Sequence, residues 1–450
     1  MRPAIVTATC LAVACAHGAR NDVTPPLLER EQNEHLLSRA TFGARPQDRE
    51  RLARIGVAAF LDEQLHPERI EDGALEAQLA KFPVLERSTA DLAQDMADER
   101  GMRRDLVTQL AQAKVMRAVA SERQLQEVMA DFWFNHFNVF AGKMNEAALL
   151  PAYEREIRER ALGRFGDLLA ATAHSPAMLV YLDNWRSSTP RPPRARATAA
   201  RRRRGLNENY ARELLELHTL GVDGGYTQAD VIEVARCFTG WTVAEEKTDP
   251  RFVFRPGMHD PGVKRVLGQE IAAGGQGDGE AVLDLLAHHP STARFVSRKL
   301  VKKFVSDDAP EALVQRAAET FLRTDGDIRS VLRTLFESPE FWSRRALHAK
   351  VRSPLELVAG SVRALGARVD DPAALARAVA RMGEPLFAAQ APTGYPDDAA
   401  AWLSAGALLA RIDFAVALSR GQVEGVAVDL DPVAARAVAL SLGSPEAQRR

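Results

Sequence analysis

Apolar side chains recur every three or four residues through much of this chain, and this spacing constrains its fold more than any other feature. The pattern is strong in Asp105–Val119 and Gln124–Phe140, and Pro46–Gln64 carries it on either side of a break at Gly56. Such spacing places apolar groups on one face of a helix, which must then pack against another element. Aromatic residues make up only 6% of the chain, whereas alanine and leucine abound, so the composition also favours helix over sheet.

Hydrophobic residues make up 46% of the 450 residues, so the chain can bury a sizeable core. We predict a mainly α protein: one large multi-helix domain over residues 30–450, with a small β-hairpin excursion. The excursion is predicted from Phe252–Phe254 and Val263–Leu267, which read as strands and flank turn residues at Pro256-Gly257 and Asp260–Gly262.

Four Ser-Pro pairs have the form of helix starts. A serine hydroxyl accepts from a free amide of the first turn, and proline at the first helical position lacks an amide that would go unpaired. We therefore expect helices to begin at Ser175-Pro176, Ser338-Pro339, Ser353-Pro354 and Ser444-Pro445. Helical spacing also occurs in Glu280–His288, Ser291–Phe304 and Leu313–Leu322.

Residues 1–16 have the features of a secretory signal peptide. Arg2 precedes a short apolar run over Ala4–Ala14, and Ala14-Cys15-Ala16 offers a small-x-small cleavage site. Leu11–Cys15 also loosely resembles a lipobox, with leucine one place early, which would leave Cys15 as a lipid-bearing N-terminus. We expect a protein exported to the periplasm or beyond. A lipid anchor at Cys15, the one route to a membrane, is the second interpretation, and a buried or frayed segment is the third.

Cysteine is sparse, with Cys10, Cys15 and Cys237 as the three examples. This number excludes a disulfide framework and a cysteine-based zinc site. Cys237 lies among apolar neighbours in a predicted helix, so we interpret it as a small buried hydrophobe; a catalytic thiol is the alternative.

Residues 186–204 hold eight arginines and three prolines without apolar periodicity, which is typical of a disordered surface insertion. A solvated insertion is the first interpretation, and contact with an anionic polymer or headgroup is the second. No aromatic residues interleave for base stacking. Because the net charge is also only −1, no nucleic-acid partner is predicted.

Gly205–Trp241 is the stretch richest in chemically capable side chains. Asn207 has the position of an N-cap for a helix over Glu208–Leu220, and Gly221 follows as a breaker. Thr227–Asp230 resembles a capping box that opens a second helix. Two helices joined by a glycine-rich turn are therefore expected here.

The first of these helices presents Arg212, Glu213 and Glu216 on one polar face. One interpretation is a solvated face on which Arg212 pairs with Glu208 or Glu216. The other places Glu213, or secondly Glu216, in a cleft as acid, base or metal ligand. His218 lies five positions beyond Glu213, about 140° around an α-helix, so the two are poorly placed to bind one ion.

Three histidines complete the candidate set. His136 and His218 lie on apolar helix faces, where a lone imidazole is usually a core residue bonded to a carbonyl. If the two converge, they could instead bind a metal or transfer protons. His259 lies on the predicted hairpin turn beside Asp260, with Lys264 nearby. Turn chemistry explains Asp260, and contact with an active site is the alternative.

Stretches spread over nearly the whole chain beyond residue 30 carry a family resemblance. They are His35–Gly43, Phe132–Phe137 (FWFNHF), Ala161–Asp183, Asn207–Gly221, Tyr226–Trp241, His259–Gly268, Ser291–Phe304, Pro392–Asp397 (PTGYPD) and Trp402–Leu418. Through them the chain resembles the bacterial domain-of-unknown-function family 1800. It departs at Phe134, where many relatives carry histidine, and at His218, where many carry phenylalanine. A metal site that needs both histidines of the first motif would be broken here.

The resemblance implies mainly helical structure and export, and it supplies no reaction, metal or cofactor. It also suggests an exported partner of the domain-of-unknown-function family 1501, which looks like a sulfatase or phosphatase relative. Our hypothesis is an exported protein of unknown activity with a hydrolase-like Glu/His site on helix 207–220. The alternative is a non-catalytic scaffold or partner-binding module for an exported hydrolase. The candidate catalytic residues are Glu213, Glu216, His136, His218 and His259, and the candidate binding residues are Asn207, Arg212, Asp260 and Lys264.

Overall fold

The computed structural model describes residues 27–450 except 99–100, 144–145, 190–204, 246–247 and 273. The predicted signal peptide, residues 1–16, and most of the arginine-rich segment 186–204 therefore lie outside the described residues. The described part of that segment begins at Arg186, the last residue of the short 3-10 helix η3 (Asn184–Arg186), and Ser187 after it is buried.

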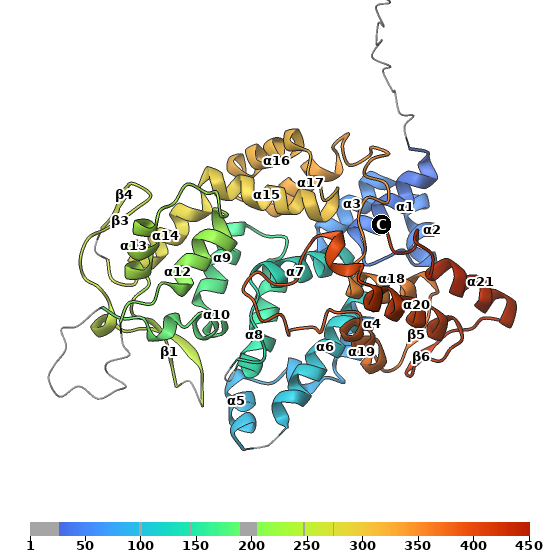
Figure 1. Ribbon diagram of the computed structural model, residues 1–450, viewed down its shortest axis with the longest axis horizontal. Helices are drawn as coiled ribbons and strands as arrows, with labels where there is room; N and C mark the ends of the chain where they lie inside the picture. Colours follow the sequence, from blue (N-terminus) through green and yellow to red (C-terminus); the bar gives the residue numbers. More distant parts are fainter. Residues whose placement is uncertain (1–26, 99–100, 144–145, 190–204, 246–247, 273) are drawn as a thin grey trace, which may run out of the picture.

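Helices account for most of the described chain, which confirms the predicted class (Figure 1). Those before residue 187 pack around α7 and α8, which lie near the middle of the molecule. They are α1 (Glu29–Ala40), α2 (Pro46–Ile55), α3 (Val57–Leu65), η1 (Pro67–Arg69), α4 (Gly73–Leu79), η2 (Pro83–Leu85), α5 (Thr89–Asp98), α6 (Met102–Ala120), α7 (Gln124–His136), α8 (Glu146–Arg160), α9 (Phe165–His174), α10 (Pro176–Tyr181) and η3.

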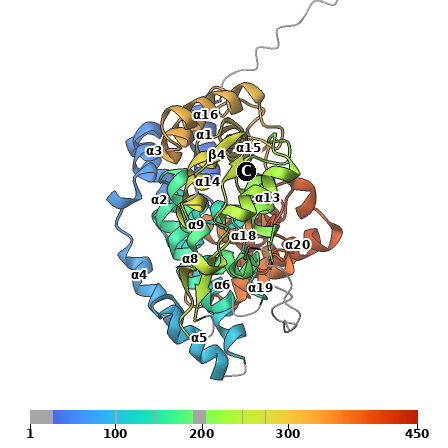
Figure 2. The ribbon, with the colours of Figure 1, turned by 90° about the vertical axis from the view of Figure 1, so that its left-hand side faces the viewer.

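The rest of the chain forms two opposite ends and one long side of the molecule (Figures 1 and 2). The β excursion, α13 and α14 lie at one end, α20 and α21 lie at the other, and α15 to α17 cover the side between them. These helices are α12 (Asn209–Glu213), η4 (Leu214–Thr219), α13 (Gln228–Cys237), α14 (Gly277–Ala287), α15 (Pro290–Phe304), α16 (Glu311–Arg323), α17 (Ile328–Phe336), α18 (Pro354–Ala364), α19 (Ala373–Arg381), η6 (Ala399–Trp402), α20 (Ala405–Ser419) and α21 (Pro432–Leu442).

The β excursion consists of two hairpins rather than one. β1 (Trp241–Ala244) pairs with β2 (Arg251–Phe254), and β3 (Lys264–Val266) pairs with β4 (Gln269–Ile271), both antiparallel. The two predicted strand segments exist, but they do not pair with each other. Each finds a partner across a shorter turn: Leu267 and Gly268, both with positive φ, form the two-residue turn between β3 and β4. The residues between the two hairpins include the short helix η5 (Pro256–Met258), and a third small pair joins β5 (Arg368–Val369) to β6 (Val426–Ala427).

Two of the four Ser-Pro pairs begin helices. Ser175 precedes α10, and Ser353 forms a reciprocal capping box with Glu356 at the start of α18. Ser338 and Ser444 each accept the same first-turn amide bond, yet the chain continues there as turns, so helices at these two pairs were wrongly expected. A cap satisfies only the first turn, and propagation depends on an apolar face to bury.

Aromatic side chains with a polar atom anchor the middle of the core. Trp133 on α7 is fully buried and donates its indole N–H to the carbonyl of Ala161 at 2.9 Å. Tyr153 on α8 donates its hydroxyl to the carbonyl of Phe137 at 2.7 Å. These bonds remove the cost of burying the polar atoms and fix α7 against α8 and its C-terminal turn. Among the described helices, none is long and apolar enough to cross a membrane.

Removal of a core side chain tests this packing. Leu332 on α17 is fully buried, so Leu332→Ala should lower the free energy of unfolding by about 2–5 kcal/mol through lost burial and a residual cavity. Leu322→Ala on the neighbouring helix α16 is the matched control, because Leu322 is exposed, and it should change that free energy by about 0.5 kcal/mol or less. Chemical unfolding measures both variants, and equal destabilisation would contradict the packing.

Candidate functional site

The predicted helix 208–220 is an α-helix followed by a π-helix. Asn207 Oδ1 accepts a hydrogen bond from the amide of Asn209 at 2.9 Å, but Glu208 is the N-cap of α12, so Asn207 lies one position before the cap that was predicted for it. From Leu214 the chain widens into η4, in which the amide of Leu220 reaches the carbonyl of Leu215, five residues back, at 2.9 Å. The angular positions assumed for an α-helix therefore do not hold across Glu216 and His218, because a π-turn spreads more residues over each turn.

The polar face of this segment is partly paired. Arg212 lies 3.3 Å from Glu208 and also donates to Gln228, and Tyr226 donates its hydroxyl to Glu216 at 3.3 Å. Glu213 is half-buried, and burial together with the nearby Glu216 raises the pKa of its carboxyl, against a smaller opposing effect of Arg212. Glu213 is thus the least compensated carboxyl of this face.

His136 and His218 converge inside the core. Their ring centroids lie 6.1 Å apart, and His136 Nε2 lies 3.0 Å from the carbonyl oxygen of His218. Because a carbonyl only accepts, His136 Nε2 donates, which leaves Nδ1 to accept from Lys299 at 3.1 Å. Both nitrogens of His136 are therefore engaged, and neither offers a lone pair to a metal.

Burial also keeps this histidine pair neutral. It lowers the pKa of His136 well below its usual range, with help from Lys299 and His218, and it lowers the pKa of His218 to about 3, again with help from Lys299. Burial lowers the pKa of Lys299 as well. Groups that remain neutral in this way favour the core interpretation of both histidines over a proton-transfer pair.

His259, Asp260 and Lys264 lie in a different place, where the hairpins meet α13 and α14. His259 Nδ1 donates to the carbonyl of Thr239 at 2.8 Å, and its Nε2 lies 3.1 Å from Asp278 Oδ2. Lys264 is fully buried and forms an ion pair with the same carboxylate, and Asp260 pairs with Arg236 at 2.9 Å. This network attaches the hairpins to the helices. Asp278 was missed because its loop IAAGGQGDG reads as flexible, although Asp278 begins the buried side of α14.

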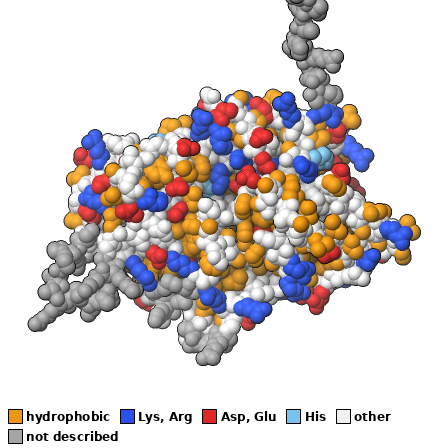
Figure 3. All heavy atoms as spheres, in the orientation of Figure 1, with side chains coloured by type: hydrophobic (Ala, Val, Ile, Leu, Met, Phe, Trp, Pro, Cys, Tyr) orange, Lys and Arg blue, Asp and Glu red, His pale blue; other side chains and the backbone are white. Residues whose placement is uncertain are grey.

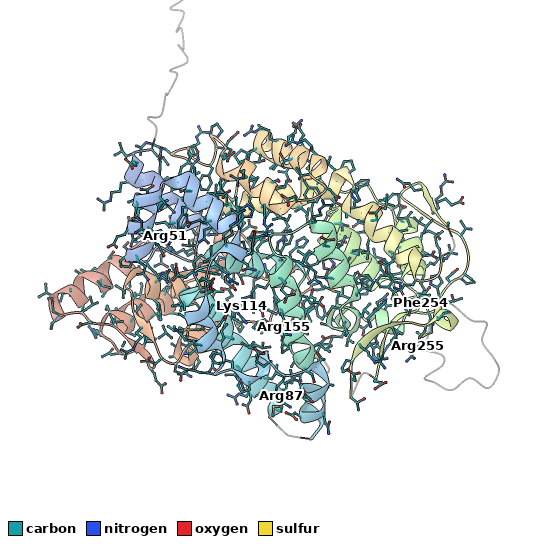
Figure 4. The ribbon with its side chains drawn as sticks, turned by 180° about the vertical axis from the view of Figure 1, so that it is seen from behind. Arg51, Arg87, Lys114, Arg155, Phe254 and Arg255 are labelled. Carbon is teal, nitrogen blue, oxygen red and sulfur yellow. The ribbon has the colours of Figure 1, made fainter. Side chains whose placement is uncertain are left out.

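A polar cavity of about 50 Å³ lies between α6, α7, α15 and the irregular segment around residues 384–397. This volume has room for more than one water molecule. Figure 4 labels Lys114, one of its wall residues, near the middle of the molecule, whereas Phe254, whose ring contacts His259, lies at the hairpin end. The residues of the cavity wall that could take part in chemistry are Lys114, Asp131, Asn135, Asn138, Lys303, Glu384, Tyr395 and Asp397.

Two carboxyl groups of this cavity differ in their surroundings. Asp131 forms an ion pair with Lys114 at 2.7 Å, and the Lys114 ammonium lies 5.1 Å and 5.3 Å from the ring centroids of Phe134 and Phe387. Burial and then the negative charge of Asp131 raise the pKa of Glu384 to about 8, while the Leu355 amide and Lys114 act in the opposite direction. At neutral pH Glu384 is therefore mostly a protonated acid beside an ion-paired carboxylate.

Two asparagines of α7 and the turn after it hold the opposite wall in place. Asn135 exchanges two hydrogen bonds with the backbone of Tyr395, at 2.8 Å and 2.7 Å, and Asn138 donates to the carbonyls of Ala389 and Ala391. Gly394 has φ +69°, and a Cβ there would lie 2.3 Å from Asn135 Oδ1, so only glycine permits this approach. The motifs FWFNHF and PTGYPD, far apart in sequence, thus meet at the cavity.

Neither Asp131 nor Glu384 was singled out from the sequence, and Asp397 entered only as the last residue of the motif PTGYPD. Asp131 directly precedes FWFNHF, which is a signal that could have found it, whereas Glu384 stands in no recognisable motif. Conversely, Glu213, His136 and His259 do not belong to the cavity walls. Within the described ranges, no group of three or more histidine, cysteine or acidic side chains is arranged to hold a metal ion.

The family comparison supports the resemblance found in the sequence. A family model described as "Protein of unknown function (DUF1800)" matches residues 35–450. No curated protein and no solved structure matches the chain.

The pH dependence of stability tests the state of Glu384. Between pH 4.5 and about 8 the folded protein retains a proton that the unfolded chain releases, so stability relative to Glu384→Gln should fall as pH rises through this window. The slope for one proton is at most about 1.4 kcal/mol per pH unit. Glutamine keeps an oxygen that can accept the Leu355 amide but cannot ionise. Chemical unfolding across this range should show the divergence; parallel curves for the two proteins would refute the raised pKa.

Proposed function

The chain belongs to the DUF1800 family of proteins of unknown function, and we propose that it is an exported hydrolase-like enzyme in which Glu384 is the proton donor. The observation that carries the proposal is the pair of carboxyl groups in the cavity, one protonated at neutral pH and one ion-paired. Neighbouring carboxyls with different protonation states are one arrangement that acid–base hydrolysis uses.

In the proposed reaction a water molecule in the cavity attacks the bond to be cleaved. Asp131 accepts the proton that this water releases, and Glu384 donates its own proton to the leaving group. After the products leave, Asp131 gives up its proton and Glu384 takes one back through solvent, which restores both groups for the next turnover. Lys114 positions Asp131 through their ion pair. The cavity has room for water but not for a whole sugar or peptide, so the substrate would present one polar group past the segment Pro392–Trp402.

Glu213 remains the proposed acid or base of the alternative site on α12 and η4. Its support is half-burial and a raised pKa, without an enclosing cavity. In that site Glu216 is the second choice and Arg212 would bind an anionic group. Glu384 is preferred because it is buried and lines a cavity together with a second carboxyl group.

A panel of chromogenic esters, phosphate and sulfate monoesters and glycosides tests the proposal. The wild-type protein should turn over at least one class, and Glu384→Gln and Asp131→Asn should each lower kcat/KM by about 100-fold or more, because a general acid or base contributes on that order. Glu50→Gln, at an exposed position, is the control. Circular dichroism should show that all variants remain folded.

The outcomes separate the candidate functions. If Glu213→Gln lost activity while Glu384→Gln kept it, the active site would lie on α12 and the proposal would be overturned. Absence of turnover across the whole panel would favour the non-catalytic alternative, a binding module for an exported sulfatase- or phosphatase-like protein of the domain-of-unknown-function family 1501. That alternative predicts co-purification with such a partner.

Export is part of the proposal and rests on residues 1–16, with Arg2, the apolar run and the small residues around Cys15 as its support. Expression in a bacterial host followed by fractionation should recover the protein outside the inner membrane. Mass spectrometry should find a mature N-terminus soon after Ala16, or a lipid-modified Cys15 that Cys15→Ala abolishes. Recovery of the uncleaved chain in the cytoplasm would contradict export.

A further inference from the structure

The helix α21 has an apolar sequence, PVAARAVALSL, yet none of its residues is buried. Val433 and Leu440 are 81% and 72% exposed. Its neighbour α20 buries one face in the core and exposes Leu408, Leu409 and Ile412 on the other, with Leu409 61% exposed. Figure 3 shows hydrophobic side chains gathered over this end of the molecule, where Figure 1 places α20 and α21. Apolar surface gathered in this way is typical of a docking face.

The exposed residues of each helix follow helical spacing. On α21 they are Pro432, Val433, Arg436, Ala437, Leu440 and Ser441, and on α20 they are Ala405, Gly406, Leu408, Leu409, Ile412 and Asp413. Each helix therefore has one continuous outward face. Each face carries a single charged residue, Arg436 on α21 and Asp413 on α20. Neither side chain forms an ion pair or hydrogen bond with another described residue of the chain.

We infer that this end of the molecule is the interface of a homodimer. A two-fold axis lets the outward face of α21 in one copy pack on the outward face of α20 in the other, and the same contact is repeated in reverse. Arg436 then lies opposite Asp413 of the second copy in both halves. The charge complementarity favours a second copy as the occupant, because the two faces supply opposite single charges within otherwise apolar surfaces.

The same residues argue against a lipid surface as the occupant. Helices that lie on membranes carry several lysines or arginines along the edge of their apolar face. Here the two outward faces have one arginine and one aspartate, so their charges cancel. A lipid headgroup would gain nothing from Asp413.

The size of the two outward faces determines how tightly the dimer is expected to associate. Helices of 15 and 11 residues are roughly 22 Å and 16 Å long, so the contact area is small, at or below the lower limit for stable specific interfaces. We therefore expect a dimer that forms at micromolar concentration and dissociates on dilution. Sedimentation velocity of the purified protein over a wide concentration range should show a reversible shift from monomer to dimer.

Charge exchange identifies the contact. Asp413→Arg and Arg436→Asp should each raise the dissociation constant by about ten-fold or more, because like charges then face each other. The double variant restores opposite charges across the two-fold axis and should recover most of the affinity. Leu409→Glu should abolish the dimer, whereas Val263→Glu, an equally drastic change at an exposed position in the β excursion, should leave it unchanged.

Three results would overturn this inference. The first is a monomer at every concentration, and the second is a double variant no better than either single variant. The third is binding to vesicles of phosphatidylcholine and phosphatidylglycerol that Leu409→Glu abolishes, which would assign the face to a membrane. Circular dichroism and thermal unfolding of each variant keep a folding defect distinct from a lost interface.

Discussion

The contact between the end of α7 and the segment 389–395 is the constraint on which the candidate site depends. Asn135 and Asn138 lie three residues apart, so their amides follow one side of the helix end and reach four backbone partners of a segment more than 250 positions later. An irregular segment cannot bury its backbone groups without such partners. Once it is held, Tyr395 and Asp397 close one wall and Asp131, one turn earlier on α7, forms the other.

Because the carboxyl groups near this cavity are buried, their protonation states depend on which cations lie close to them. Burial alone would raise the pKa of both Glu356 and Glu384. Arg450 and Lys303 contact Glu356 at 2.9 Å and 2.8 Å, and they lower its pKa far below its usual range. Glu384 has no such contact, and the negative charge of Asp131 instead reinforces the effect of burial. Two glutamates near the same cavity are thus held in opposite protonation states, one as a structural ion and one as an acid.

The fold class and the approximate bounds of helices such as α6, α15 and α16 could be predicted because they depend on local spacing, and the start of α18 could be predicted from the cap Ser353. The pairing of the strands could not be predicted. Phe252–Phe254 and Val263–Leu267 could have paired with each other, and the geometry of the turns decides that each pairs with a different strand. From the sequence, we considered that His136 and His218 could converge. The sequence could not show that Lys299 donates a hydrogen bond to Nδ1 of His136, the nitrogen that a metal would otherwise need. Glu384 could not be identified from the sequence, because its pKa depends on packing between α18, α6 and α7 and not on its neighbours in the chain.

The central claim is that Glu384 holds a proton at neutral pH in a small polar cavity that it lines together with Asp131. Titration of the side-chain carboxyl carbons by nuclear magnetic resonance, with Glu384→Gln to assign the signal, measures this directly. The account predicts that the signal absent from Glu384→Gln changes between its acid and base forms near pH 8. A Glu384 signal that has already reached its ionised form below pH 6 would contradict the account.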